Sequence, residues 1–247
     1  MERITSLQNP LIRHIRKLQS DAKYRKECRE FVADGYKLLD EALKWYPEIL
    51  TVICSDESRC PSLPDNVRLV SVPVGLMQSL SEMKTPQGVV FTCRMPQQIR
   101  HEVRPGSIVL DRIQDPGNLG TILRTADAFG IPVILTNGCA DAYSLKTLRA
   151  SMGAVLRTHP VSLPMEELLR DCSERNIPLI ATALTEYARD IRETDLRQGL
   201  VVIGSEGQGI CDTLLHASRD HIIIPMQPRC ESLNAAVAAA IVMWQMQ

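Results

Sequence analysis

Three polar segments in the second half of the chain carry residue types that can do chemistry, and each directly follows a short apolar run. They are residues 111–120, 204–209 and 225–234. Consecutive apolar residues are typical of parallel strands that are buried on both faces. Ligands bind at the carboxyl ends of the strands in open α/β sheets. The sequence therefore places its candidate chemistry at three strand ends.

The first segment runs through a Pro-Gly turn into a helix expected over Thr121–Phe129. Asn118 stands where a helix N-cap belongs, and capping is the simplest interpretation of it. Arg124 is expected one turn into that helix, where its side chain would point back toward the same strand end. The alternative for Arg124 is an ordinary surface arginine.

The second segment is a glycine-rich turn around an acidic residue, Glu206. Glycine-rich turns after strands often bind phosphates. The glycine spacing here is not that of a dinucleotide site, and a carboxylate would repel a pyrophosphate. A nucleotide-dependent oxidoreductase is therefore disfavoured. The alternative to any binding role is a tight turn that needs three permissive residues.

The third segment is stiffened by Pro225 and Pro228, which end the preceding strand. Ser232 and Asn234 are good helix caps, and that is again their simplest interpretation. The helix expected next, Ala235–Met246, is apolar almost all round. We therefore expect it to be buried in the core or against a partner chain.

The elements that position these segments form an α/β domain with a mainly parallel sheet over residues 107–247. Its expected strands are Ser107–Leu110, Val133–Thr136, Leu179–Ala183, Leu200–Ile203 and His221–Ile224. A polar linker is expected over residues 98–106. Residues 1–97 predict a small α/β domain, with helices over Asn9–Gln19 and Phe31–Tyr46 and strands near Leu50–Cys54, Val67–Val70 and Val89–Cys93.

Composition limits the class of protein. The 247 residues are 45% hydrophobic, and 28 Lys+Arg against 29 Asp+Glu give a net charge of −1. Intrinsic disorder and a uniformly basic polyanion binder are excluded. Residues 1–29 nevertheless hold eight basic and three acidic side chains, which suits either a nucleic-acid contact or a solvated helix face.

Location and metal content follow from what the sequence lacks. No apolar run reaches the roughly 20 residues of a membrane span, and the N-terminus has no signal core, so a cytoplasmic protein is expected. None of the eight cysteines forms a C-x-x-C pair. Reduced thiols and no metal are therefore expected.

Taken together, the three segments resemble the three motifs of the SpoU (TrmH) family of RNA ribose methyltransferases, in the SPOUT superfamily. The motifs are D-P-x-N-x-G-x-x-x-R-x-A-x-A-F-G, G-x-E-x-x-G and I-P-M…S-L-N-V-S-V-A. The matching residues are Asp115, Pro116, Asn118, Gly120, Arg124, Ala126, Ala128, Phe129 and Gly130, then Gly204, Glu206 and Gly209, then Ile224-Pro-Met226 and Glu231-Ser-Leu-Asn234. The departures are Ala235-Ala236 in place of V-S, and Cys230 in the loop.

The resemblance implies transfer of a methyl group from S-adenosylmethionine to a ribose 2′-hydroxyl. It also implies a C-terminal trefoil knot and a homodimer whose partner chain completes the site. The implied cofactor positions are Thr182, Gly204, Ile224, Met226 and Leu233, and the implied catalytic ones are Arg124, Asn118, Glu206, Ser232 and Asn234. Because a guanidinium is almost never deprotonated, we expect Arg124 to hold the adjacent phosphate and stabilise a developing alkoxide. The other four residues would order Arg124, the ribose and the loops.

Residues 1–97 resemble the RNA substrate-binding domain that often precedes this catalytic domain, which favours ribosomal RNA (23S-like) over transfer RNA. A tRNA ribose methyltransferase is the alternative within the family. A SPOUT enzyme that methylates a base nitrogen is a further alternative, against which Asn118, Arg124 and the Ser-Leu-Asn segment speak. A non-catalytic RNA-binding or assembly factor is a third, and loss of Arg124 or Asn118 would have indicated it.

Overall fold

The computed structural model describes residues 2–83, 85–97, 103–230 and 232–247. Part of the expected linker (98–102) and Glu231 of the third segment lie outside these described residues. The chain divides into two compact units, one of residues 1–97 with 143–157 and one of residues 98–142 with 158–247. The inclusion of residues 143–157 in the N-terminal unit was not predicted from the sequence.

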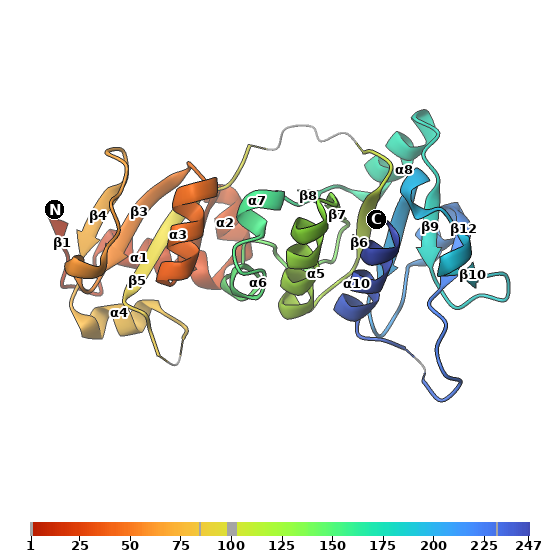
Figure 1. Ribbon diagram of the computed structural model, residues 1–247. Coiled ribbons are helices and arrows are strands. Elements are labelled where there is room, and N and C mark those ends of the chain that lie inside the picture. Colours follow the sequence, from red (N-terminus) through yellow and green to blue (C-terminus); the bar gives the residue numbers. More distant parts are fainter. Residues whose placement is uncertain (1, 84, 98–102, 231) are drawn as a thin grey trace. The chain divides into compact units, whose positions relative to one another are not determined.

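The N-terminal unit is built on a five-stranded mixed sheet of order β1-β4-β3-β5-β2 (Figure 1). Its strands are β1 (Glu2–Arg3), β2 (Glu30–Asp34), β3 (Ile49–Cys54), β4 (Arg68–Ser71) and β5 (Val89–Arg94). Strands β1, β4 and β3 run parallel, and β5 pairs antiparallel with β3 and β2. The helices are α1 (Pro10–Ser20), α2 (Ala22–Cys28), α3 (Tyr36–Trp45), α4 (Val74–Leu80), α6 (Leu145–Ala150) and α7 (Val155–Thr158).

The helix expected over Phe31–Tyr46 is wrong in its first part, because residues 30–34 form strand β2. The run Phe31-Val-Ala is fully buried and pairs with β5, so tertiary pairing overrides the helical pattern. Gly35, at φ +100°, then separates the strand from α3.

The basic segment at the N-terminus is anchored in this unit. Helix α1 buries Ile12, Ile15 and Leu18 completely, so its basic residues occupy the opposite face. Arg25 is 5% exposed and donates to the carbonyl oxygens of Leu18 and Gln19 at the end of α1. Its charge therefore serves the fold and is unavailable to a ligand.

The second unit confirms the predicted parallel sheet. Its order is β10-β12-β9-β11-β6-β7-β8, and every neighbouring pair is parallel. The strands are β6 (Ser107–Asp111), β7 (Val133–Leu135), β8 (Val161–Ser162), β9 (Leu179–Thr182), β10 (Arg189–Asp190), β11 (Leu200–Gly204) and β12 (Ser218–Ile223). The five expected strands are all present, whereas the two-residue strands β8 and β10 are too short for a sequence pattern to indicate.

Helices cover both faces of this sheet. Helices α8 (Met165–Glu174) and α9 (Asp212–Ala217) pack on a core that includes Val109, Ala181 and Val202. Helices α5 (Pro116–Phe129) and α10 (Ala235–Gln245) lie side by side against the sheet (Figure 1). None of the described helices combines the length and the apolar character that crossing a membrane requires.

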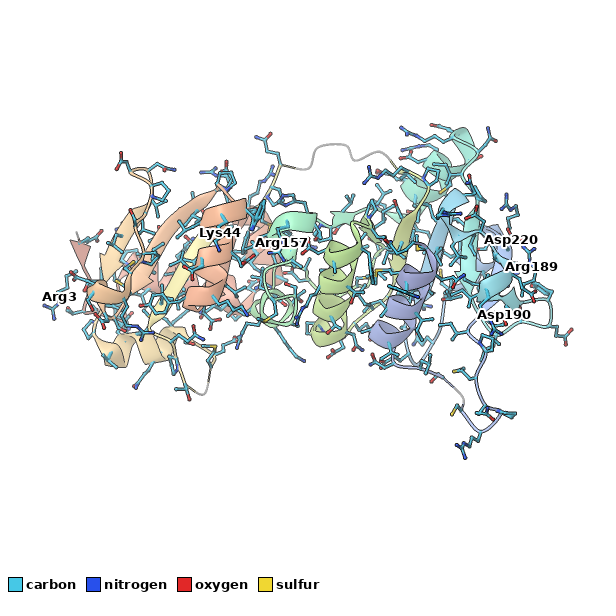
Figure 2. All side chains as sticks on the ribbon, viewed as in Figure 1. Arg3, Lys44, Arg157, Arg189, Asp190 and Asp220 are labelled. Carbon is cyan, nitrogen blue, oxygen red and sulfur yellow. The ribbon has the colours of Figure 1, made fainter. Side chains whose placement is uncertain are left out.

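The connection between β9 and β10 crosses the strand that lies between them. Thr182 of β9 and Arg189 of β10 both stand in register with Ile222 of β12. The crossing segment is fastened to β12, since the amide of Ala183 donates to the carbonyl of Ile222 at 3.1 Å. Arg189 of the outermost strand β10 forms an ion pair with Asp220 of β12 (Figure 2). A crossing this short is unusual for parallel strands, and the trefoil knot stays a prediction.

Candidate active site

The three polar segments follow three strands of one parallel sheet, so they all begin at the end of the sheet where the strands finish, which we call the carboxyl edge. The first follows β6, the second follows the adjacent β11, and the third follows β12, two strands along from β11. The side chains of Asn118, Glu206 and Asn234 meet there, and we call them the Glu206 cluster. Residues 116 positions apart in the chain are thereby in direct contact.

A single carboxylate oxygen is the centre of the Glu206 cluster. Oε1 of Glu206 accepts from Nδ2 of Asn118 at 2.9 Å, from Nδ2 of Asn234 at 2.5 Å and from the amide of Ala235 at 3.0 Å. Nδ2 of Asn234 also lies 3.1 Å from Oδ1 of Asn118. Oε2 of Glu206 accepts no hydrogen bond from the described part of the chain, and the side chain is exposed. The cluster therefore presents an ordered carboxylate with one free oxygen.

Asn118 reaches this cluster because it is not the helix cap. Helix α5 begins at Pro116, and Asp115 caps it by accepting from the amide of Asn118 at 2.8 Å. Gly117 permits this cap, since a Cβ there would lie 2.8 Å from Oδ1 of Asp115. The expectation that Asn118 caps the helix is wrong. Because Asp115 is the cap, the side-chain amide of Asn118 is available to contact Glu206.

Asn234 does cap its helix and belongs to the cluster as well. Oδ1 accepts from the amides of Ala236 and Val237 at 3.0 and 3.3 Å, while Nδ2 donates into the cluster. Glu206 thus lies at the N-terminus of α10, where the helix dipole stabilises a negative charge. One residue fixes both the start of the helix and the position of the carboxylate.

Arg124 and Ser232 are not brought to the cluster within the chain. Because α5 begins at Pro116, Arg124 lies more than two turns into it, not one turn as expected. It is about 9 Å along the helix from Asn118 and about 240° around it. Both Arg124 and Ser232 are exposed, and neither side chain forms a hydrogen bond or ion pair within the described residues.

The expected cofactor positions lie at the same edge of the sheet. Thr182 is half-buried at the end of β9, and its Oγ1 donates to the carbonyl of Val202 at 2.9 Å. Gly204 ends β11 where a Cβ would lie only 2.3 Å from the carbonyl carbon of Gly209, so only glycine fits. Half-buried apolar side chains line the segments after β12: Ile224, Met226 and Leu233.

Asp111, the last residue of β6, belongs to the site although the sequence motifs do not single it out. Its side chain is completely buried, and its two oxygens accept from Oγ1 of Thr136 at 3.1 Å and from the amide of Cys211 at 2.8 Å. Arg112 is paired with it at 3.3 Å. An acidic residue that closes an otherwise apolar strand was the available signal.

Comparison with known proteins assigns the family. Residues 105–244, more than half of the chain, match the model of the SpoU rRNA Methylase family. The chain belongs to this family. Residues 9–90 of this SpoU methylase also match the model of the MRM3-like substrate binding domain.

Relatives cover the whole length of this SpoU methylase. It is 31% identical to a 23S rRNA (guanosine(2553)-2′-O)-methyltransferase of Bacillus subtilis, over 100% of both chains. It is 36% identical to an uncharacterized tRNA/rRNA methyltransferase of Synechocystis, over 98% of this chain and 92% of that one. The structure resembles the AdoMet-bound rRNA methyltransferase of Sinorhizobium meliloti with a TM-score of 0.87 and 30% identity, over 99% and 97% of the two chains.

Proposed function

We propose that this SpoU methylase transfers the methyl group of S-adenosylmethionine to a ribose 2′-hydroxyl of ribosomal RNA. The observation that carries the proposal is the convergence of three distant segments on Oε1 of Glu206. The Bacillus subtilis relative, whose name specifies 2′-O-methylation of 23S rRNA, and the AdoMet-bound structural neighbour support it.

The residues at this edge suit the cofactor. S-adenosylmethionine supplies an electrophilic methyl group on a sulfonium centre. Gly204 lets the backbone of Gly209 approach the end of β11 closely, while Ile224, Met226 and Leu233 offer partly buried apolar surface to an adenosine. Thr182 already donates to Val202, so its hydroxyl oxygen remains able to accept a further hydrogen bond.

Transfer would form a bond from the methyl carbon to the 2′-oxygen as the bond to sulfur breaks, leaving S-adenosylhomocysteine and releasing the hydroxyl proton to water. The protein must align the 2′-oxygen with the methyl group and stabilise the charge that forms. In our assignment the free Oε2 of Glu206 accepts a hydrogen bond from the ribose, and Asn118 and Asn234 hold the carboxylate in place. The guanidinium of Arg124 binds the adjacent phosphate and stabilises the developing alkoxide. Ser232 orders the loop beside the cofactor.

This assignment requires a second copy of the chain, because Arg124 does not reach the Glu206 cluster of its own chain. Helix α10 exposes an apolar stripe at helical spacing, with Val237, Ile241 and Trp244 being 49%, 36% and 69% exposed. Trp244 also contacts the ring of Phe129 on α5. We propose that a homodimer covers this face and places Arg124 beside the partner's cluster.

The preference for ribosomal RNA rests on the N-terminal unit. Arg13, Arg16 and Lys17 are exposed on α1 at i, i+3 and i+4, where they can contact phosphates together. The match to a substrate-binding domain over residues 9–90 supports the same role. The proposal includes the cytoplasmic location that the sequence predicts.

The test is a map of 2′-O-methyl groups in total RNA from cells with and without the gene. We expect one site in ribosomal RNA to lose its methyl group without the gene, and regain it from a wild-type copy but not from one carrying Glu206→Gln. Mass spectrometry of nuclease digests then places the methyl group on the sugar. A methyl group on the base, a lost site in transfer RNA alone, or an unchanged map would contradict the proposal.

A further inference from the structure

The turn that carries Glu206 is held at its base as well as at its tip. Ser205 and Gly209 exchange two backbone hydrogen bonds, of 3.1 and 2.9 Å, so the turn closes on itself. The Glu206 cluster fixes the tip. The base continues into Cys211, whose amide donates to the buried Asp111 at 2.8 Å.

Asp111 is an internal anchor and not a surface acid. It is 0% exposed, and Thr136 at the end of the neighbouring β7 donates to its other oxygen. A buried carboxylate is costly unless its oxygens are hydrogen-bonded. The amide of Cys211 is one of those bonds, so the chain after the turn is drawn to the end of β6.

Arg112 holds the turn from a second direction. Its Nη1 donates to Oε1 of Gln208 at 3.0 Å, and its Nη2 donates to the carbonyl of Gly209 at 3.4 Å. Its backbone lies in the left-handed region, at φ 56°, which disfavours residues other than glycine. Gly138 provides room for the side chain, since a Cβ there would lie 3.1 Å from Cγ of Arg112.

We propose that Asp111 and Arg112 are positioning residues that clamp the 204–211 turn in the shape that binds S-adenosylmethionine. The inference rests on the proposed assignment of the cofactor to this turn. Neither residue touches the reacting atoms. They act through the backbone of Gly209 and Cys211, and so they govern cofactor affinity more than the rate of methyl transfer at saturation.

The test compares cofactor binding, turnover and stability in a small set of full-length variants. Arg112→Met removes the contacts of Arg112 with Gln208 and with Gly209. Gln208→Leu removes only the first of these, whereas Gln208→Glu keeps an acceptor for Arg112. Asp111→Asn weakens the hydrogen bond that residue 111 accepts from the amide of Cys211. Asp34→Asn, at a buried aspartate that ends β2 in the N-terminal unit, is the matched control. Calorimetry measures S-adenosylmethionine binding without RNA, and hydrogen exchange follows the amides of residues 205–211.

We expect Arg112→Met and Gln208→Leu to weaken binding by about five- to tenfold, and Asp111→Asn by tenfold or more. The turn amides should exchange faster in all three. kcat at saturating cofactor should stay within about threefold for Arg112→Met and Gln208→Leu. Gln208→Glu should bind like the wild type. Asp34→Asn should alter thermal stability but neither binding nor exchange in the turn.

Two results overturn the clamp. One is cofactor affinity within twofold of the wild type for both Arg112→Met and Asp111→Asn. The other is a loss of binding by Asp111→Asn that its fraction of unfolded protein fully accounts for. Met226→Asp, at an expected cofactor position outside the turn, separates this failure from failure of the cofactor assignment. If Met226→Asp abolishes binding while the clamp variants bind normally, only the clamp is wrong. If Met226→Asp also binds normally, the cofactor lies elsewhere and both inferences fall.

Discussion

Each unit buries an aspartate at the last position of a strand, and the two are satisfied differently. Asp111 ends β6, and both of its oxygens accept hydrogen bonds. Asp34 ends β2 and accepts from Ser81 at 3.0 Å, but its Oδ1 lies 3.6 Å from Arg149 and forms no hydrogen bond among the described residues.

The difference reflects two roles: Asp34 helps attach residues 143–157 to the N-terminal unit, whereas Asp111 positions the turn that carries Glu206. The Arg149 contact belongs to a segment, residues 143–157, that joins the N-terminal unit across a long stretch of chain. A loose ion pair suffices to hold a helix whose packing does the rest. A turn that must present Glu206 within hydrogen-bond distance of two asparagines needs tighter bonds. Both oxygens of Asp111, which holds that turn, therefore accept hydrogen bonds.

The largest effect is expected for Arg124, which we assign to the chemical step and not to holding the turn. Arg124→Ala should lower kcat/KM by about a thousandfold or more while S-adenosylmethionine still binds, because charge stabilisation at the reacting oxygen is lost. Methylation of substrate RNA and calorimetry measure the two quantities. Near wild-type turnover would remove Arg124 from the mechanism.

A mixing experiment sharpens the same prediction. Arg124→Ala and Glu206→Ala chains, inactive alone, should regain activity when mixed, to roughly a quarter of the wild-type level if subunits exchange randomly. This follows because one of the two sites in a mixed dimer then has both residues. Mixing two preparations of Arg124→Ala is the control. No recovery, in a mixture shown to contain mixed dimers, would mean that each site is built from one chain.

Asn234→Ala is expected to have an intermediate effect, since this residue has two roles. Loss of the cap on α10 should destabilise the protein by about 1 kcal/mol, and loss of the contact with Glu206 should lower kcat by about tenfold to a hundredfold. Asn234→Ser restores a cap but not the amide donor. It should recover stability without activity, and recovery of both would show that Asn234 is only a cap.

Asp34→Asn tests the attachment side directly. The free energy of unfolding should fall by about 1–3 kcal/mol because the ion pair with Arg149 is lost from a buried site. Cofactor affinity should not change. Denaturant unfolding and calorimetry provide the measurements, and a tenfold loss of affinity would refute the division of roles between the two aspartates.

The smallest effect concerns the basic face of α1. Arg13→Gln with Arg16→Gln should reduce the slope of log affinity against log salt by one to two, about one for each lost phosphate contact. These side chains are exposed, so the fold should persist. Deleting residues 1–29 would instead remove the buried face of α1. An unchanged slope would assign the basic face to solvent.

The sequence predicted the parallel sheet and the polar segments that follow its strands, because apolar strands and motif residues are local signals. They failed where a partner distant in the chain decides. Residues 30–34 become a strand only through pairing with β5, and Asp111 matters only because Cys211 comes back to it. The cap at Asp115 was a local signal that a plausible alternative, Asn118, concealed.

The three donors on Oε1 of Glu206 have a consequence for how the protein becomes active. They come from α5, from the segment after β12 and from the first residue of α10, so the carboxylate is ordered only when all of these have reached the sheet edge. A chain that has folded its sheet but not docked α10 has no assembled centre. Methyl transfer is thereby restricted to completely folded molecules, and the return of activity during refolding should report the arrival of the last helix.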